Sequence, residues 1–340
     1  ETLFESFISL INLAIDEKSP YTGGHCQRVP ELTMMLAEAV NRHHRGPLAS
    51  FSMDDKDRYA LKIAGLLHDC GKVTTPVHVV DKATKLQTLF DRIELIDTRF
   101  EVLKRDQEIA ALRAQLALRD AKDTASESAI LAKCRQCIDA LDDDREFLRK
   151  VNQGAESMKD TDLQRVRDIG HLHTWRNVQG VQSDLLNADE LENLTIRAGT
   201  LTSAERDTIN HHIVATIKML EQLPWPKHLK AVPEYAGGHH ERMDGKGYPK
   251  GLTREQMSVQ ARVMGIADIF EALTAKDRPY KQGMKLSQAM GIMHKFKLGG
   301  HIDPDLFDVF VQEKVYLRYA EKFLDPWQID AVDPSLWATT

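Results

Sequence analysis

Helical periodicity is the feature that most restricts the fold of this 340-residue chain. Apolar residues recur at steps of three and four in one segment after another, whereas the alternation of Val and Ile that is typical of β-strands is nearly absent. Segment 3–15 shows the helical pattern, with an apolar stripe made of Leu3, Phe4, Phe7, Ile8, Ile11 and Ile15. We therefore expect an all-α fold.

Composition excludes several classes of protein. Apolar residues make up 42% of the chain, enough for a substantial core. The net charge of −6 argues against a general binder of polymeric nucleic acid or membrane surfaces. No apolar run approaches the roughly 18 residues of a membrane span, and no signal peptide is recognisable. Four cysteines do not form a disulfide framework in a chain of this length, so we expect a reducing cytoplasm.

Cap signals mark where several helices begin and end. The chain already has a helical pattern next to Glu1, so we expect a piece of a longer protein. A capping box at Ser52–Asp55 predicts one helix start, and Thr202–Glu205 predicts another. Gly71 is expected to end the helix that precedes it in the left-handed conformation. The methionines at 34, 35, 284, 290 and 293 are expected to lie in the core.

A change of pattern near residue 86 predicts an insertion. Two heptad seams follow, separated by a polar break over 120–126. The first contains Leu89, Ile93, Ile96, Phe100 and Leu103, and the second contains Ile130, Cys134, Cys137, Leu141, Leu148 and Val151. We expect an antiparallel helical hairpin, with the two cysteines as small core residues, because no second cysteine pair completes a zinc site. Residues 87–200 form this insertion, and 332–340 are a C-terminal tail.

Pairs of metal-binding side chains stand at helix ends and on apolar helices. His68-Asp69 ends an apolar helix, and His239-His240 stands where a helix gives way to a glycine-rich loop. Asp268 lies within the most apolar helix, where an unpaired carboxylate would be costly. A helix-terminal His-Asp pair alone is more typical of an ordinary polar cap. The set as a whole favours a buried site that binds something positive.

These motifs, in this order, resemble the HD-GYP family, a variant of the HD hydrolases. The residues that carry the resemblance are His25, His68-Asp69-Cys70-Gly71-Lys72, His212, His239-His240-Glu241, Asp244–Pro249, Asp268 and Asp277–Lys281. The resemblance covers segments 1–86 and 201–331. It implies a discontinuous HD-GYP catalytic core, that is, an HD-type multi-helix bundle interrupted by the helical-hairpin insertion.

The resemblance also implies a two-metal site. His25, His68, Asp69 and Asp268 would hold one ion. His212, His239 and His240 would hold the second, with Asp69 bridging both. His212 is preferred to His211 because the family ligand lies three residues after an Ile, here Ile209.

One departure from the family bears on the number of metals. Some relatives hold a third metal with a Glu four residues before the first His ligand, and here that residue is Tyr21. We therefore expect two divalent ions rather than three. Iron or manganese is expected, with nickel, cobalt, zinc and magnesium as alternatives.

Further positions are matched to substrate. Lys72 would act on a phosphate oxygen or on the leaving 3′ oxygen, and Asp69 shares the catalytic role. Arg278 and Lys281 resemble phosphate-contacting positions, although their spacing from Asp268 is one residue longer than in many members. The substrate-binding set also includes Gly247 and Tyr248 of the Gly-Tyr-Pro loop, which in the family is associated with contacts to diguanylate cyclase (GGDEF) domains.

The implied activity is that of a bacterial, cytoplasmic phosphodiesterase that converts cyclic di-GMP to pGpG and onward to GMP. Two alternatives remain open at this point: a 3′,3′-cyclic GMP-AMP phosphodiesterase, and a catalytically silent module that binds the nucleotide or a cyclase. A homodimer is expected to form through the insertion or through an upstream domain.

Overall fold

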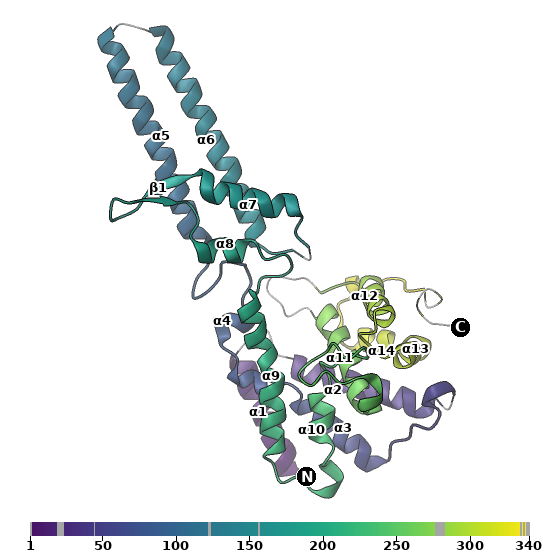
Figure 1. The fold of residues 1–340 in the computed structure, drawn as a ribbon. Helices are drawn as coiled ribbons and strands as arrows, with labels where there is room; N and C mark the ends of the chain where they lie inside the picture. The colour runs from purple at the N-terminus through teal and green to yellow at the C-terminus, as the bar shows by residue number, and fades with distance from the viewer. Residues whose placement is uncertain are drawn as a thin grey trace. The chain divides into compact units, whose positions relative to one another are not determined.

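Helices dominate the computed structural model, which describes residues 2–18, 24–43, 45–121, 124–155, 157–275 and 283–333, with Ser335 and Trp337 (Figure 1). The strands among these residues form one two-stranded antiparallel sheet. The all-α expectation is confirmed. Within the described ranges, no helix is both long and apolar enough to cross a bilayer. The chain divides into two compact units, Glu1–Val80 with Thr208–Thr340, and Asp81–Asp207.

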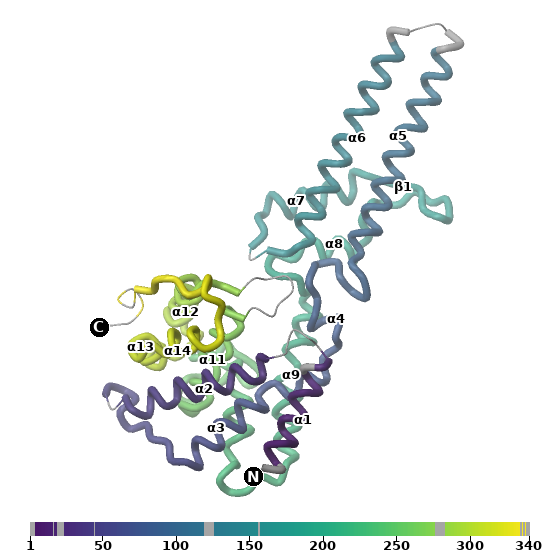
Figure 2. Tube along the Cα trace, turned by 180° about the vertical axis from the view of Figure 1, so that it is seen from behind, coloured from purple at the N-terminus to yellow at the C-terminus, as the bar shows by residue number. Residues whose placement is uncertain are grey.

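The first unit is a helical bundle with α2 at its centre. Its helices are α1 (Thr2–Lys18), α2 (His25–Arg42), α3 (Asp55–Leu67), α4 (Val77–Val80), α9 (Ser203–Glu221), α10 (Val232–Gly237), α11 (Val259–Thr274), α12 (Leu286–Leu298), α13 (Pro304–Gln312) and α14 (Val315–Phe323). Helix α2 packs against α3 on one side and against α11, α13 and α14 on the other, as Figure 2 shows. The fully buried Leu32 and Leu36 of α2 belong to the same core as Phe270 of α11 and Phe310 of α13.

Helix α1 packs by a narrower stripe than its sequence predicts. Ile8 and Ile15 are buried, but Phe7 is 57% exposed and Ile11 is 39% exposed. Within the first unit, α1 contacts α3 and the 3-10 helix η2 (Cys70–Thr74). These neighbours cover only the side that carries Ile8 and Ile15.

The caps agree with the sequence at one helix and differ at another. At α9 the Thr202 hydroxyl accepts from the Glu205 amide and the Glu205 carboxylate accepts from the Thr202 amide, so the predicted box is confirmed. Helix α3 is capped by Asp54, not Ser52. The Asp54 carboxylate accepts from the amides of Lys56 and Asp57, and the Asp57 carboxylate accepts from the Asp54 amide. A carboxylate at this position also meets the positive end of the helix dipole.

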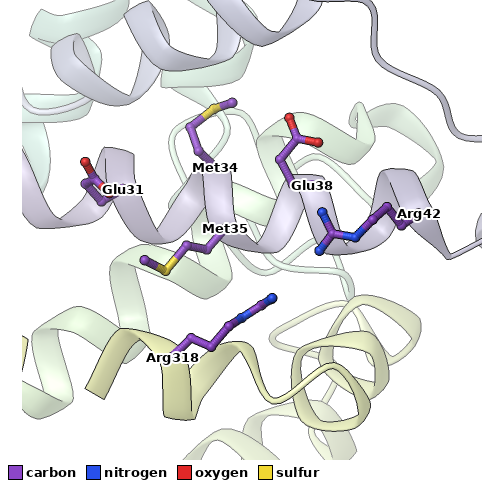
Figure 3. Close-up of a pocket in the computed structure, with 6 residues that line it drawn as sticks. All are labelled: Glu31, Met34, Met35, Glu38, Arg42 and Arg318. Atoms are coloured by element: carbon purple, nitrogen blue, oxygen red, sulfur yellow. The ribbon is translucent and has the colours of Figure 1, made fainter. Parts of the chain in front are cut away.

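The expectation that all five methionines are core residues is only partly confirmed. Met290 and Met293 are fully buried. Met34 and Met35 are half-buried and line a shallow pocket of about 340 Å³ beside Glu31, Glu38, Arg42 and Arg318 (Figure 3). Met34 and Met35 therefore lie on a face of α2 that borders this pocket, and both also pack against the core, as does the partly buried Met284.

The second unit contains the expected antiparallel hairpin of α5 (Ile93–Ala121) and α6 (Thr124–Asn152) (Figure 1). Lys104 pairs with Asp142 at 3.0 Å, and Glu101 pairs with Arg145 at 3.2 Å. From the first pair to the second, the residue number falls on α5 and rises on α6, as it must when two helices run antiparallel. Phe100, Leu103, Leu141 and Leu148 are buried in this unit's own core.

Two details of the hairpin differ from the predicted seams. Leu89 is 94% exposed and precedes α5, which begins at Ile93. Cys134 and Cys137 are half-buried rather than fully enclosed.

Residues after the hairpin complete the second unit. They form α7 (Asp160–Leu172), the strands β1 (Thr174–Arg176) and β2 (Gln182–Asp184), and α8 (Ala188–Leu194). The unit boundaries at 80/81 and 207/208 lie six and seven residues from the expected insertion ends at 86/87 and 200/201. Lys82 and Lys85 explain part of this difference, because both are buried in the second unit. Lys82 pairs there with Glu205, because the first turn of α9, up to Asp207, belongs to the second unit.

Lys85 predicts a pH dependence of stability. Its ammonium donates to the carbonyl oxygens of Leu194 and Ile196 at 3.1 and 2.8 Å, and burial lowers its pKa from 10.5 to about 8. Between these two values the unfolded chain binds more protons than the folded chain, so Lys85 adds stability as the pH rises. We expect the free energy of unfolding of the wild type, relative to Lys85→Met, to increase from pH 8 to 10.5 in urea titrations. A difference that stays constant over this range would contradict the assignment.

Candidate metal centre

Side chains from five segments of the first unit converge on one site. His25 is the first residue of α2, and His68 and Asp69 follow the last turn of α3. His212 lies in α9, His239 and His240 follow α10, and Asp268 lies in α11. The seven predicted ligands are thus brought together, although they span more than 240 residues of sequence.

The first group consists of His25, His68 and Asp69, whose ligand atoms lie within 4.8 Å of one another. Asp268 joins it, because its Oδ1 is 3.2 Å from His25 Nε2 and 3.8 Å from His68 Nε2. Two imidazoles and two carboxylates therefore surround a single point.

The second group consists of His212, His239 and His240, again with ligand atoms within 4.8 Å. The Nε2 atoms of His212 and His240 are 3.2 Å apart. Asp69 stands between the groups: its Oδ2 is 3.1 Å from His25 Nε2, and its Oδ1 is 3.3 Å from His212 Nε2. His212 is buried and His211 is exposed, which favours His212 over its neighbour.

Backbone carbonyls orient three of the imidazoles. The Nδ1 atoms of His68, His212 and His239 lie 2.5–2.7 Å from the carbonyl oxygens of Gly65, Ile209 and Ala236, in each case three residues earlier. A carbonyl can only accept, so each Nδ1 carries the proton and each Nε2 directs a lone pair into the site.

These residues fit a pair of metal ions. Within the described ranges, the Nε2 atoms of His68 and His239 are buried without a hydrogen-bond partner. Burial lowers the pKa of His239, and it lowers that of His240 to about 4, so both imidazoles are neutral. Burial alone would raise the pKa of Asp69, but Lys72 and His68 outweigh it, and this pKa lies well below its usual value. The neutral imidazoles of His239 and His240, together with the ionised Asp69, are donors that suit divalent metals.

Lys72 adds a fixed positive charge at the edge of the first group. Its Nζ is 2.5 Å from Asp69 Oδ2. Burial would lower its pKa, but Asp69 and Asp268 raise it, so the ammonium stays protonated. The side chain retains 22% exposure, so it can meet a ligand that enters from solvent.

Gly71 does not end α3 in the left-handed conformation, as the sequence predicted. It lies within η2, and it is not among the glycines of positive φ. Its amide donates to Thr216 Oγ1 at 2.9 Å, and a Cβ at this position would lie 2.0 Å from the His212 carbonyl oxygen. Glycine is required because the segment carrying Asp69 approaches α9 closely at this point.

The Gly-Tyr-Pro loop is tied to the second group. The Tyr248 ring stacks on His240, with centroids 4.9 Å apart, and the Tyr248 amide donates to the His240 carbonyl. Buried Glu241 accepts from the amides of Lys250 and Leu252. At Gly247 a Cβ would lie 2.5 Å from the Glu241 Cα, so only glycine fits there.

Some predicted residues lie outside the described ranges, and some site residues were not predicted. Tyr21, Arg278 and Lys281 belong to the first kind. The sequence analysis missed Glu271, which contacts His25 and Arg28, and it gave no role to Glu241. The signal for Glu271 was its helical spacing of three from Asp268, matched by the spacing of Arg28 from His25.

Models of a known protein family match the segments that contain this site. The HD domain family matches residues 22–144 and again residues 186–306. The two matches contain all seven candidate ligands and the Gly-Tyr-Pro loop. The chain belongs to the HD-GYP type of HD-domain proteins. The HD domain family is metal-dependent, in keeping with the two candidate ligand groups of this HD-GYP chain.

Curated relatives are cyclic dinucleotide enzymes by name. A 3′3′-cGAMP-specific phosphodiesterase 1 of Vibrio cholerae is 35% identical over 43% of this chain and 30% of its own length. A probable cyclic di-GMP phosphodiesterase of V. cholerae is 33% identical over 39% of the chain and 31% of its own length. A cyclic di-GMP phosphodiesterase of Pseudomonas aeruginosa is 37% identical over 34% of this chain and 27% of its own length. The HD-GYP chain thus spans less than a third of each of these relatives.

Gly71→Ala tests the close approach of η2 to α9. The added methyl group collides with the backbone at His212, so we expect a loss of about 1–3 kcal/mol in the free energy of unfolding. We also expect the metal content to fall, because Asp69 and His212 move apart. Thermal unfolding and elemental analysis measure these effects. Gly291→Ala is the matched control: it lies in α12, and its Cβ would meet Trp337 at an ordinary 3.5 Å. Equal metal content in the two variants would contradict the prediction.

Proposed function

We propose that this chain is the catalytic part of a bacterial phosphodiesterase that hydrolyses cyclic di-GMP to pGpG, and onward to GMP, at a two-metal site. The observation that carries the proposal is the position of Asp69, whose two oxygens face two separate groups of histidines. A shared carboxylate between two ligand groups is suited to a pair of ions that act on one phosphoryl group.

The names of the relatives support a cyclic dinucleotide substrate but divide over its bases. Some are named for cyclic di-GMP and others for 3′3′-cGAMP. Cyclic di-GMP stays our first candidate, and cyclic GMP-AMP is the alternative. A catalytically silent module is disfavoured because both ligand groups are complete.

The proposed cofactors are two divalent ions, with iron or manganese first. His25, His68, Asp69 and Asp268 would hold one ion, and His212, His239 and His240 would hold the other, with Asp69 bridging. Imidazole and carboxylate donors suit both metals, and nickel, cobalt, zinc and magnesium are alternatives. Bound ions of this kind act as Lewis acids towards a phosphoryl oxygen and an attacking water.

The remaining chemistry comes from the chain's own side chains. The protonated Lys72 Nζ would donate to a non-bridging phosphate oxygen or to the leaving 3′ oxygen, with Asp69 fixing its position. Arg278 and Lys281 are proposed to contact the second phosphate. Gly247 and Tyr248 are proposed to contact the substrate, with Tyr248 held flat against His240. Lys72, Arg278 and Lys281 would supply local positive charge in a chain whose net charge is −6.

One assay tests the activity. Protein loaded with Mn(II) or, under anaerobic conditions, Fe(II) is incubated with cyclic di-GMP and with 3′,3′-cyclic GMP-AMP, and linear products are separated by chromatography. We expect pGpG from the first substrate at the higher rate. Faster cleavage of cyclic GMP-AMP would select the alternative. No cleavage of either by protein shown to contain two ions per chain would overturn the enzyme proposal.

Site variants separate metal binding from chemistry. His68→Ala combined with Asp69→Ala should lose metal and activity together. Lys72→Met should keep both ions and lose activity by on the order of 100-fold, because one donor to the transition state is removed. Metal content and initial rates are measured on the same samples. Full activity of Lys72→Met would remove Lys72 from the mechanism.

We also propose that the hairpin is a surface for self-association. Ile109, Leu112 and Leu116 of α5 are 44%, 58% and 62% exposed. Their spacing of three and four places them on one face, turned away from buried Ala111. A second copy of this apolar face is the proposed partner.

The exposed Lys246 side of the Gly-Tyr-Pro loop is the proposed contact for a cyclase domain.

Charge on the exposed face tests self-association. Leu112→Glu with Leu116→Glu should convert a dimer to a monomer, because like charges would face one another across the contact. Ala117→Glu, on another exposed face of α5, is the matched control and should stay dimeric. Light scattering coupled to size-exclusion chromatography gives the masses. A monomeric wild type, or a dimer that survives the double substitution, would contradict this role of the hairpin.

A further inference from the structure

His25 is oriented differently from its neighbours in the metal centre. His68, His212 and His239 each donate from Nδ1 to a backbone carbonyl three residues earlier. His25 is the first residue of α2, so no preceding turn of that helix supplies such a carbonyl. Its Nδ1 instead lies 2.5 Å from Oε2 of Glu271 on α11.

Glu271 is itself held by a fixed cation. Its other oxygen, Oε1, accepts from Nε of Arg28 at 2.7 Å, and the Arg28 Nη2 also lies at 2.7 Å. The Glu271 side chain is 1% exposed. A carboxylate buried to this extent needs a charged partner, and guanidinium keeps its proton at any ordinary pH.

The residue spacing along α2 and α11 lets both helices contact the His25 ring. His25 and Arg28 are one turn apart on α2, and Asp268 and Glu271 are one turn apart on α11. Asp268 faces His25 Nε2 at 3.2 Å while Glu271 faces His25 Nδ1, so the ring is held from both edges. Gly24 leaves room for Arg28, because a Cβ there would lie 2.5 Å from the Arg28 Nη1 atom.

We propose that Glu271, backed by Arg28, is the positioning residue that makes His25 a metal ligand, so that it governs metal binding at the first group and not at the second. This rests on the proposed metal centre. Two acceptor oxygens are required, one for the His25 Nδ1 proton and one for Arg28. A glutamine of the same shape offers one acceptor and one donor, so it cannot satisfy both partners.

Metal binding to Glu271→Gln is the test. Metal-free protein is dialysed against a series of Co(II) concentrations, with elemental analysis for stoichiometry and visible absorption for the coordination of each ion. We expect two ions in the wild type. In the variant we expect the second group to bind as before and the first group to bind about 10–100-fold more weakly, as for other residues that orient metal ligands.

Rescue separates positioning from bulk stability. In Glu271→Gln with Arg28→Gln, the residue at 271 can accept from His25 and donate to the residue at 28. We therefore expect affinity at the first group to recover towards that of the wild type. Asp303→Asn is the matched control, since Asp303 is also buried and paired with arginines, Arg254 and Arg262, but contacts no candidate ligand. It should lower thermal stability without changing Co(II) affinity.

The outcomes are distinct. Wild-type Co(II) affinity at both groups in Glu271→Gln would overturn the positioning role and leave the metal centre intact. Equal weakening at both groups, or no recovery in the double variant despite a cooperative thermal transition, would assign Glu271 to general stability and also overturn the proposal. A wild type that binds no Co(II) would overturn the metal centre itself, and the positioning role with it.

Discussion

The close approach of η2 to α9 is the contact on which the rest of the site depends. Gly71 donates from its amide to Thr216, and its missing side chain lets the His212 carbonyl lie where a Cβ would otherwise be. Asp69, two residues earlier, is thereby placed between the ligand groups. A larger residue at 71 would push η2 away from α9, and with it Asp69 away from His212.

Burying this many polar rings is stable only because each has a defined partner. His68 and His239 use carbonyls in the last turn of a helix, where backbone acceptors are free of the regular helix bonds. His212 uses the carbonyl of Ile209 within α9. His25 lies at a helix start and uses Glu271 instead, which in turn needs Arg28. What remains without a hydrogen bond, such as the Nε2 atoms of His68 and His239, points into one small volume. That convergence distinguishes a metal centre from a set of satisfied core histidines.

The candidate metal ligands and the helical hairpin belong to different units of the chain. All seven candidate ligands belong to the first unit, whereas the second has its own core and its own ion pairs along α5 and α6. A long insertion can therefore interrupt the sequence of an HD domain between Lys72 and His212 without contributing a ligand. The exposed apolar face on α5 is consistent with a role in assembly rather than in chemistry.

The sequence by itself determined the elements and the residue types. Periodicity predicted the helices and the hairpin. The resemblance of the motifs to the HD-GYP family predicted the seven candidate ligands, because only a few types of side chain bind metal ions. It failed where a role depends on contact between distant segments. Gly71 was predicted to end a helix and is instead a point of close packing, while Glu271 was given no role and contacts His25 Nδ1. Only the tertiary structure decided these roles, because local pattern records which residues a helix contains but not which side chain of another helix meets them.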